Sequence, residues 1–139
     1  MEHIKLPAKF REEAFDRVDS FLRYGGIESA LARDVISADF VDILGIASHP
    51  SRTPLIDFSR CKSEPSGLRD SAYFWGGIFP ESLRKTNLTP RDFANTLDIA
   101  YSHLQELYGP VIGKSPRVLE AFHEAYQSFS EGERRRLLH

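Results

Sequence analysis

Hydrophobic residues recur with helical spacing near the start of the chain. Residues 6–26 carry a proline in the first turn and end at a glycine pair, which are typical positions for these residues around a helix. At about 100° per residue the apolar side chains fall within one arc about 140° wide, and acidic side chains such as Glu12 and Asp16 fall opposite. The pattern predicts an amphipathic helix with an apolar face of Phe10, Ala14, Phe15, Val18, Phe21 and Leu22.

The next segment, residues 27–48, is also rich in helix formers, and its pattern leaves two interpretations open. Ser37 is a residue type that caps helices, so the segment is either one bent helix or two short ones. The apolar positions expected to face the core are Leu31, Val35, Ile36, Val41 and Leu44.

The C-terminal third predicts further helices with clear beginnings. Thr89, Pro90 and Asp92 supply an N-cap, a first-turn proline and a carboxylate that reaches back, at the start of a helix over residues 89–110. Ser115 and Pro116 repeat the arrangement for residues 115–129, and residues 130–139 carry a capping pattern for a last helix. The two apolar stripes are Phe93, Leu97, Ala100, Tyr101, Leu104, Leu107 and Tyr108, then Val118, Phe122, Ala125, Tyr126 and Phe129.

The centre of the chain, residues 46–88, has no clear period. Residues 48–54 are typical of a loop, residues 54–61 of a strand or a buried extended segment, and residues 66–75 and 80–87 of short helical turns. We therefore expect an all-α fold and a single compact domain, residues 1–139. Five or six helices would surround the irregular central segment, which has room for one short extended piece.

Composition narrows the environment of the protein. Of its 139 residues 41% are hydrophobic, and the formal net charge of −2 exerts no general attraction on nucleic acid or anionic lipid. The single cysteine, Cys61, permits no intrachain disulfide and suits a reducing compartment. The sequence shows no signal peptide and no apolar run of about 20 residues, so we expect a cytoplasmic protein without a membrane segment.

Two pairs of histidine and glutamate have the spacing found in carboxylate-bridged metal sites. These are Glu120 with His123, and His103 with Glu106. On the helical wheel all four lie away from the apolar stripes and face water, whereas such a metal site must project inward. We therefore expect no metal and no cofactor.

Cys61 is the candidate nucleophile. It lies between Arg60 and Lys62, which favour the thiolate, and His49 and Asp57 lie in the same loop region. Nearness along a loop fixes no geometry, and the ligand pairs of a zinc site and the motifs of common hydrolases are missing from the sequence. A metal or thiol enzyme is therefore the third hypothesis.

A nucleic-acid-binding regulator is the second hypothesis. Residues 81–108 can be drawn as two helices around a turn, with Arg84, Lys85 and Arg91 placed near phosphate. The exposed face of the second helix carries the acidic Asp98, which opposes DNA, and the chain as a whole is not basic. A second basic group near the end of the chain consists of Arg134, Arg135 and Arg136.

Residues 71–82, SAYFWGGIFPES, hold the densest aromatic cluster. Neither a helix nor a strand directs all of its apolar side chains inward, and each aromatic ring buries about 150–250 Å². The cluster is therefore either a core plug or a partly exposed partner surface, in which Trp75 or Phe79 anchors another protein. Its members are Tyr73, Phe74, Trp75, Ile78 and Phe79.

The leading hypothesis is a small protein-binding module that acts by steric contact, without catalysis. An adaptor, an antagonist or an immunity-type inhibitor would act in this way, and the same apolar surface would suit a homodimer. The acidic stretch over residues 27–45 adds Asp39 and Asp42 as candidate contacts for a basic groove on the partner.

Overall fold

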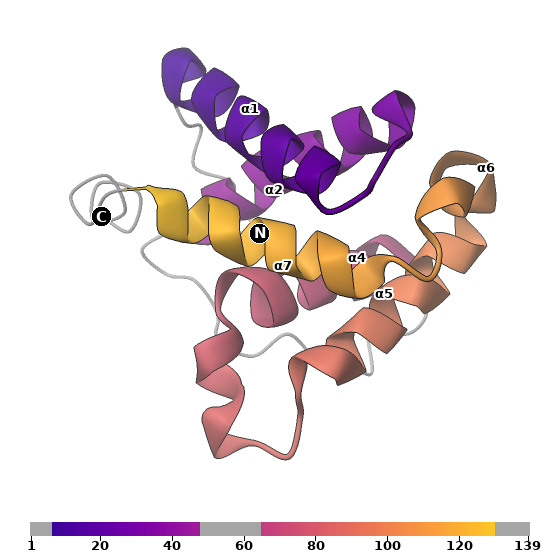
Figure 1. The fold of residues 1–139 in the computed structure, drawn as a ribbon. Helices are drawn as coiled ribbons and strands as arrows, with labels where there is room; N and C mark the ends of the chain where they lie inside the picture. The colour runs from indigo at the N-terminus through magenta and orange to yellow at the C-terminus, as the bar shows by residue number, and fades with distance from the viewer. Residues whose placement is uncertain (1–6, 48–64, 130–139) are drawn as a thin grey trace.

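The computed structural model describes residues 7–47 and 65–129, which form helices joined by short turns (Figure 1). Within these two ranges there are six α-helices and no strand, so the all-α prediction is confirmed for the part that is described. The α-helices are α1 (Ala8–Tyr24), α2 (Ala30–Ala47), α4 (Pro65–Ser71), α5 (Pro90–His103), α6 (Gln105–Tyr108) and α7 (Ser115–Ser128). Between them lie the π-helix η1 (Ala72–Ile78) and the 3-10 helices η2 (Pro80–Lys85) and η3 (Gly109–Val111).

Helix α1 begins after Pro7 and ends at the glycine pair, as its sequence predicts. The predicted apolar face contributes Ala14, Val18 and Leu22 to the core. Gly26 has a φ of 90°, a left-handed conformation that glycine adopts without steric cost, and the chain turns there into α2. The two helices pack against each other and are joined by an ion pair between Asp19 and Arg33, with an N···O distance of 3.1 Å.

Helix α2 is one continuous helix, which decides between the two interpretations of this segment. Ser37 lies fully buried within it and does not cap a second helix. Ile36 and Leu44 are buried as expected, whereas Leu31, in the first turn, is 64% exposed and lies outside the core.

Helix α5 begins with the predicted capping box, in which Thr89 and Asp92 satisfy each other's backbone N–H groups. The helix predicted over residues 89–110 is nevertheless broken at Leu104, where φ is −116° and ψ is 37°. In a straight helix Tyr101 and Tyr108 would lie about 10 Å apart along the axis. Because of the break, their rings stack with centroids 4.4 Å apart.

Helix α7 lies between α1 and α5 and packs on both, as well as on η1 (Figure 1). The predicted apolar stripe is buried along its length. The prediction that Ser115 caps this helix is wrong, because Lys114 occupies the N-cap position and its side chain makes no capping hydrogen bond. Ser115 is instead a buried residue whose hydroxyl donates to Asp98 Oδ1 on α5.

The central segment is helical from Pro65 onward. Residues 66–75 and 80–87 contain the helical turns predicted for them, in α4 with η1 and in η2. Within η1 the backbone makes the wider turn of a π-helix, which ends with a hydrogen bond from Phe79 N to Phe74 O at 3.0 Å. The loop and extended piece predicted for residues 48–61 lie outside the described residues.

Two glycines allow η1 to approach its neighbours closely. A Cβ atom on Gly76 would lie 2.7 Å from Phe93 Cβ on α5, and one on Gly77 would lie 3.0 Å from Phe122 Cβ on α7. A methyl group at Gly76 would therefore force neighbouring atoms to shift, and one at Gly77 would make an unusually tight contact. The glycine pair therefore sets the spacing between η1, α5 and α7, which is also the region of the candidate site.

Candidate functional site

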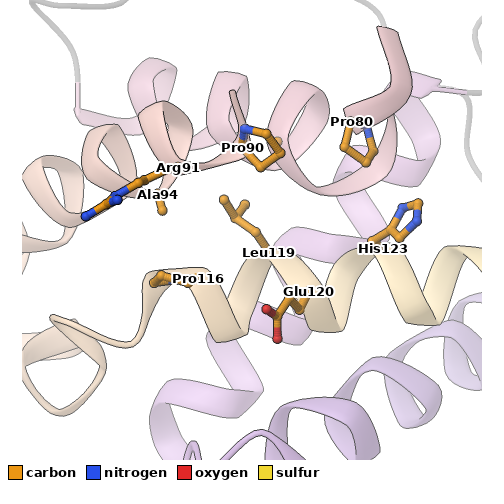
Figure 2. Close-up of a pocket in the computed structure, with 9 residues that line it drawn as sticks. Pro80, Pro90, Arg91, Ala94, Pro116, Leu119, Glu120 and His123 are labelled. Carbon is orange, nitrogen blue, oxygen red and sulfur yellow. The ribbon is translucent and has the colours of Figure 1, made fainter. Parts of the chain in front are cut away.

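A groove runs between α5 and α7 beside η1 and η2, with a volume of about 500 Å³. We call it the proline groove, because Pro80, Pro90 and Pro116 line it (Figure 2). Each of these prolines stands in the first turn of its helix, which is a favoured position for proline because no N–H is needed there. The three helix starts therefore meet along one apolar wall.

The floor of the proline groove is formed by small or deeply set residues. Ala94 and Leu119 are each only 3% exposed, and Gly76 has no side chain. Leu119 points from α7 toward Pro90 on α5, as Figure 2 shows. The groove is therefore narrow and apolar, and it fits inserted side chains better than a flat surface.

Three polar side chains line the edges of the groove: Arg91, Glu120 and His123. Arg91 and His123 lie toward opposite ends, and Glu120 turns its carboxylate away from α5 (Figure 2). The Arg91 side chain is exposed and has no hydrogen bond or ion pair with any described residue. Glu120 forms an exposed ion pair with Arg117 at 3.6 Å, one turn away on α7.

His123 corrects one expectation of the sequence analysis. It is half-buried in the wall of the groove instead of facing open water, and its Nδ1 atom is buried without a hydrogen-bond partner in the structure. A buried polar atom of this kind calls for an explanation, because leaving it unpaired costs free energy. His103 and Glu106 are exposed, as predicted.

The described residues offer little support for a metal site at this groove. Glu120 and His123 are its only residues of ligand type, and no group of three or more such side chains occurs in the parts of the chain covered by the structure. What the groove provides is an apolar floor with an exposed arginine at one end, whereas the unpaired Nδ1 of His123 is buried.

A second polar cluster, near the C-terminal end of α5, was missed by the sequence analysis. Tyr108 Oη donates to Asp39 Oδ2 at 3.1 Å, and Arg69 Nη1 donates to Tyr108 Oη at 3.2 Å. Arg69 Nε lies 3.5 Å from Asp39 Oδ2, as an ion pair without hydrogen-bond geometry. The hydroxyl groups of Tyr73 and Tyr101 lie 2.6 Å apart, and both side chains are fully buried.

Burial dominates the electrostatics of this cluster. It raises the pKa of Asp39 to about 6, although Arg69 and the Tyr108 hydroxyl act in the opposite direction. Burial also raises the pKa of Tyr73 and Tyr101 well above the ordinary tyrosine value. A signal for the cluster was present in the sequence, since Asp39 lies three residues after Ile36 and four before Ile43, at the edge of the buried face of α2.

The predicted partner residues are distributed between the core and the surface. Tyr73, Phe74 and Ile78 are buried and form no surface, because η1 is enclosed by its neighbouring helices. Trp75 and Phe79 are half-buried, and both pack edge-on against Phe74. The core-plug interpretation therefore applies to most of the cluster.

The two predicted acidic contacts differ in availability. Asp39 is held by Arg69 and Tyr108, so its carboxylate is not free for a partner. Asp42 is exposed and lines a second groove, between α1 and α2, together with Arg11 and Val41.

The structure describes the side chains of only some of the basic residues that were predicted to contact nucleic acid. Arg91 lies at the proline groove, and for Arg84 and Lys85 only the backbone, in η2, is described. Asp98, expected on an exposed recognition face, is half-buried and accepts hydrogen bonds from Gly113 N and Ser115 Oγ. The candidates that lie outside the described residues are His49, Asp57, Cys61, Arg134, Arg135 and Arg136.

Among the helices described, none has the length and apolar character needed to cross a membrane. Comparison of the chain with protein-family models, with curated proteins and with solved structures finds no match. Any assignment of function therefore rests on the geometry of this chain alone.

Proposed function

We propose that this protein is a binding module that acts by contact with another protein, and that the proline groove receives a segment of that partner. The observation that carries the proposal is a preformed groove with an apolar floor, in which three first-turn prolines form part of the lining. Its volume of about 500 Å³ lies in the range of sites that bind ligands.

The lining of the groove favours binding over catalysis. Nucleophilic catalysis needs a hydroxyl, thiol or similar group beside a base that a third residue orients. The groove lining contains no serine, threonine or cysteine among the described residues, and Nδ1 of His123 accepts no orienting contact. In this proposal His123 forms part of the groove wall.

The mechanism would be steric. A rigid groove built from three helix starts would lose little conformational entropy on binding, because the glycines and prolines around it already fix its shape. The module would cover or hold a partner segment, as an adaptor, antagonist or inhibitor does, in the reducing cytoplasm that a lone cysteine suits.

The test compares a blocked groove with an equally modified surface elsewhere. Short random peptides displayed on phage would be selected against the purified protein and then bound to two variants. Pro116→Trp places a large ring at the edge of the groove, whereas Glu124→Trp places it at an exposed position of α7 outside the lining. We expect the first variant alone to lose the selected peptides.

A failure to select any peptide, or equal binding to both variants, would contradict the proposal. Retention of the unmodified protein on heparin that falls steeply with salt would favour the nucleic-acid hypothesis instead.

A further inference from the structure

We infer that residues 105–112, which comprise α6, η3 and Ile112, form a strap that opens locally when Asp39 loses its proton. The backbone turns at Leu104 and at Gly113, on either side of the strap, when it opens. The opening is independent of the proposed binding at the proline groove.

The two residues that flank the strap are suited to act as pivots. Leu104 interrupts the helix between α5 and α6, with a φ of −116° and a ψ of 37°. Gly113 has a φ of 90°, which glycine adopts without steric cost, and its N–H donates to Asp98 Oδ1 on α5 at 3.2 Å. Residues at the ends of elements commonly absorb the backbone changes of a hinge motion. The bond to Asp98 also holds the chain beyond the strap against α5.

Few side chains attach the strap to the rest of the fold. Tyr108 and Val111 are buried and Leu107 is half-buried, whereas Glu106 and Pro110 are exposed. The backbone hydrogen bonds of the strap join residues three or four positions apart along the chain. A segment with few buried contacts and local backbone bonds can open at a lower free energy than the whole domain.

Tyr108 links the strap to Asp39. Its ring stacks on Tyr101 with centroids 4.4 Å apart. Its hydroxyl lies between two charged groups, 3.1 Å from Asp39 Oδ2 and 3.2 Å from Arg69 Nη1. The Asp39 side chain is only 14% exposed in this arrangement. Opening of the strap withdraws the Tyr108 ring and hydroxyl, so water reaches the carboxyl group.

Several titratable or charged groups face Asp39 from the surrounding elements. Burial has the largest effect on its pKa and raises it, whereas the cation Arg69 on α4 lowers it. The carboxylates of Asp70, on α4, and Asp42, on α2, raise it further. Burial also raises the pKa of the tyrosines that face Asp39 from η1, α5 and α6, so they remain neutral; these are Tyr73, Tyr101 and Tyr108.

Ionisation of Asp39 favours the open strap. The closed strap holds the pKa of Asp39 at about 6, whereas the ordinary value, expected once water reaches the group, is 3.8. The closed state therefore binds the proton more tightly, and the ratio of open to closed molecules rises as pH increases from about 4 to 6. The difference of about two pKa units corresponds to roughly a hundredfold change in this ratio.

Amide hydrogen exchange of the full chain, followed by NMR at several pH values, tests the inference. A helix of four residues does not persist once detached, so opening exposes the amides of Leu107, Tyr108 and Ile112 to exchange. Exchange rates are converted to equilibrium constants for opening, which removes the intrinsic effect of pH on exchange. We expect the three constants to rise together, by about thirtyfold to a hundredfold from pH 4 to 7.

Low concentrations of urea distinguish local opening from unfolding of the domain. Because the strap exposes little surface when it opens, the constants of its amides should change little with urea. The amide of Phe122, in the middle of α7, should have a smaller opening constant that rises steeply with urea.

Matched variants identify the groups responsible. Asp39→Asn should remove the pH dependence of the strap amides, whereas Asp42→Asn, with the same charge change on the same helix, should retain it. Tyr108→Phe should raise the opening constants at least about fivefold at pH 4, because the strap loses a hydrogen bond. Tyr24→Phe, at an exposed position of α1, should leave them unchanged.

Three outcomes would overturn the inference. If the strap amides share the opening constant and the urea dependence of Phe122, the strap opens only when the whole domain unfolds. If the strap opens locally but with the same pH dependence in Asp39→Asn, or with none in the unmodified protein, Asp39 does not control it. If the strap amides are unprotected at pH 4, the strap is not closed in solution. Peptide selection tests the proposed function separately from all three.

Discussion

Tyr108 donates its hydroxyl hydrogen to Asp39 Oδ2 at 3.1 Å, and this bond connects α6 to α2. It exists because the helix breaks at Leu104 and turns Tyr108 back onto Tyr101. Arg69, from α4, contacts both partners of the bond. Three helices that are distant in sequence are therefore connected by one small polar cluster.

Removal of this hydroxyl should destabilise the fold. Tyr108→Phe leaves the ring in place but deprives Asp39 of a donor, and a hydrogen bond to a partly buried carboxyl group contributes about 1–3 kcal/mol. We expect the free energy of unfolding in urea to fall by about that amount. Tyr24→Phe is the control. Because Tyr24 is 92% exposed, this variant should unfold like the unmodified protein. Equal stability of all three proteins would rule out a structural role for the bond.

The cluster also predicts a dependence of stability on pH. Asp39 has a pKa of about 6 in the folded protein and an ordinary value of 3.8 when unfolded. Between these values the folded state holds a proton that the unfolded state has released, so the contribution of Asp39 to stability falls as pH rises from about 4 to 6. The difference between the two pKa values corresponds to about 3 kcal/mol.

Asp39→Asn isolates this effect, because asparagine keeps the shape and an acceptor oxygen but does not titrate. The free energy of unfolding in urea would be measured for both proteins at several pH values. As pH rises from 4 to 7, the value for the variant should increase relative to that of the unmodified protein, by up to about 3 kcal/mol. A constant difference across this range, or a gain in the opposite direction, would mean that Asp39 titrates as an ordinary carboxyl group.

The close approach of η1 to α5 predicts a steric effect at Gly76. A methyl group there would lie 2.7 Å from Phe93 Cβ and 3.1 Å from Leu119 Cδ1, so Gly76→Ala should cost about 1–3 kcal/mol. Gly109→Ala is the matched control, because its nearest contact, Gln105 Cγ, would be at 3.7 Å and its backbone is helical. The measurement is the midpoint temperature of thermal unfolding of each variant. A lower midpoint for Gly109→Ala but not for Gly76→Ala would contradict the close packing at Gly76.

Local signals made much of the fold predictable. The amphipathic faces of α1 and α7, and the capping box at Thr89 and Asp92, depend on residues within a few positions of one another. The break at Leu104 could not be predicted in this way, since it is associated with contacts that Tyr108 makes with distant α2 and α4. The close approach of α5 and α7 to the two glycines in η1 is likewise a tertiary feature that local sequence does not reveal.

The candidate site was less predictable than the fold. The helical wheel placed His123 on the water-facing side of α7, and it could not reveal that Pro80 and the start of α5 would border the same space and leave His123 half-buried. Three first-turn prolines were visible in the sequence, yet only tertiary packing brings Pro80, Pro90 and Pro116 together.

The most direct test of the binding function is a two-dimensional ¹⁵N–¹H NMR titration of the labelled protein with a peptide selected from the displayed library. The account predicts that the largest shifts fall on the backbone amides of Gly76, Arg91, Ala94, Leu119 and His123. Shifts concentrated instead at the groove between α1 and α2, around Arg11, Phe15 and Val41, would contradict it.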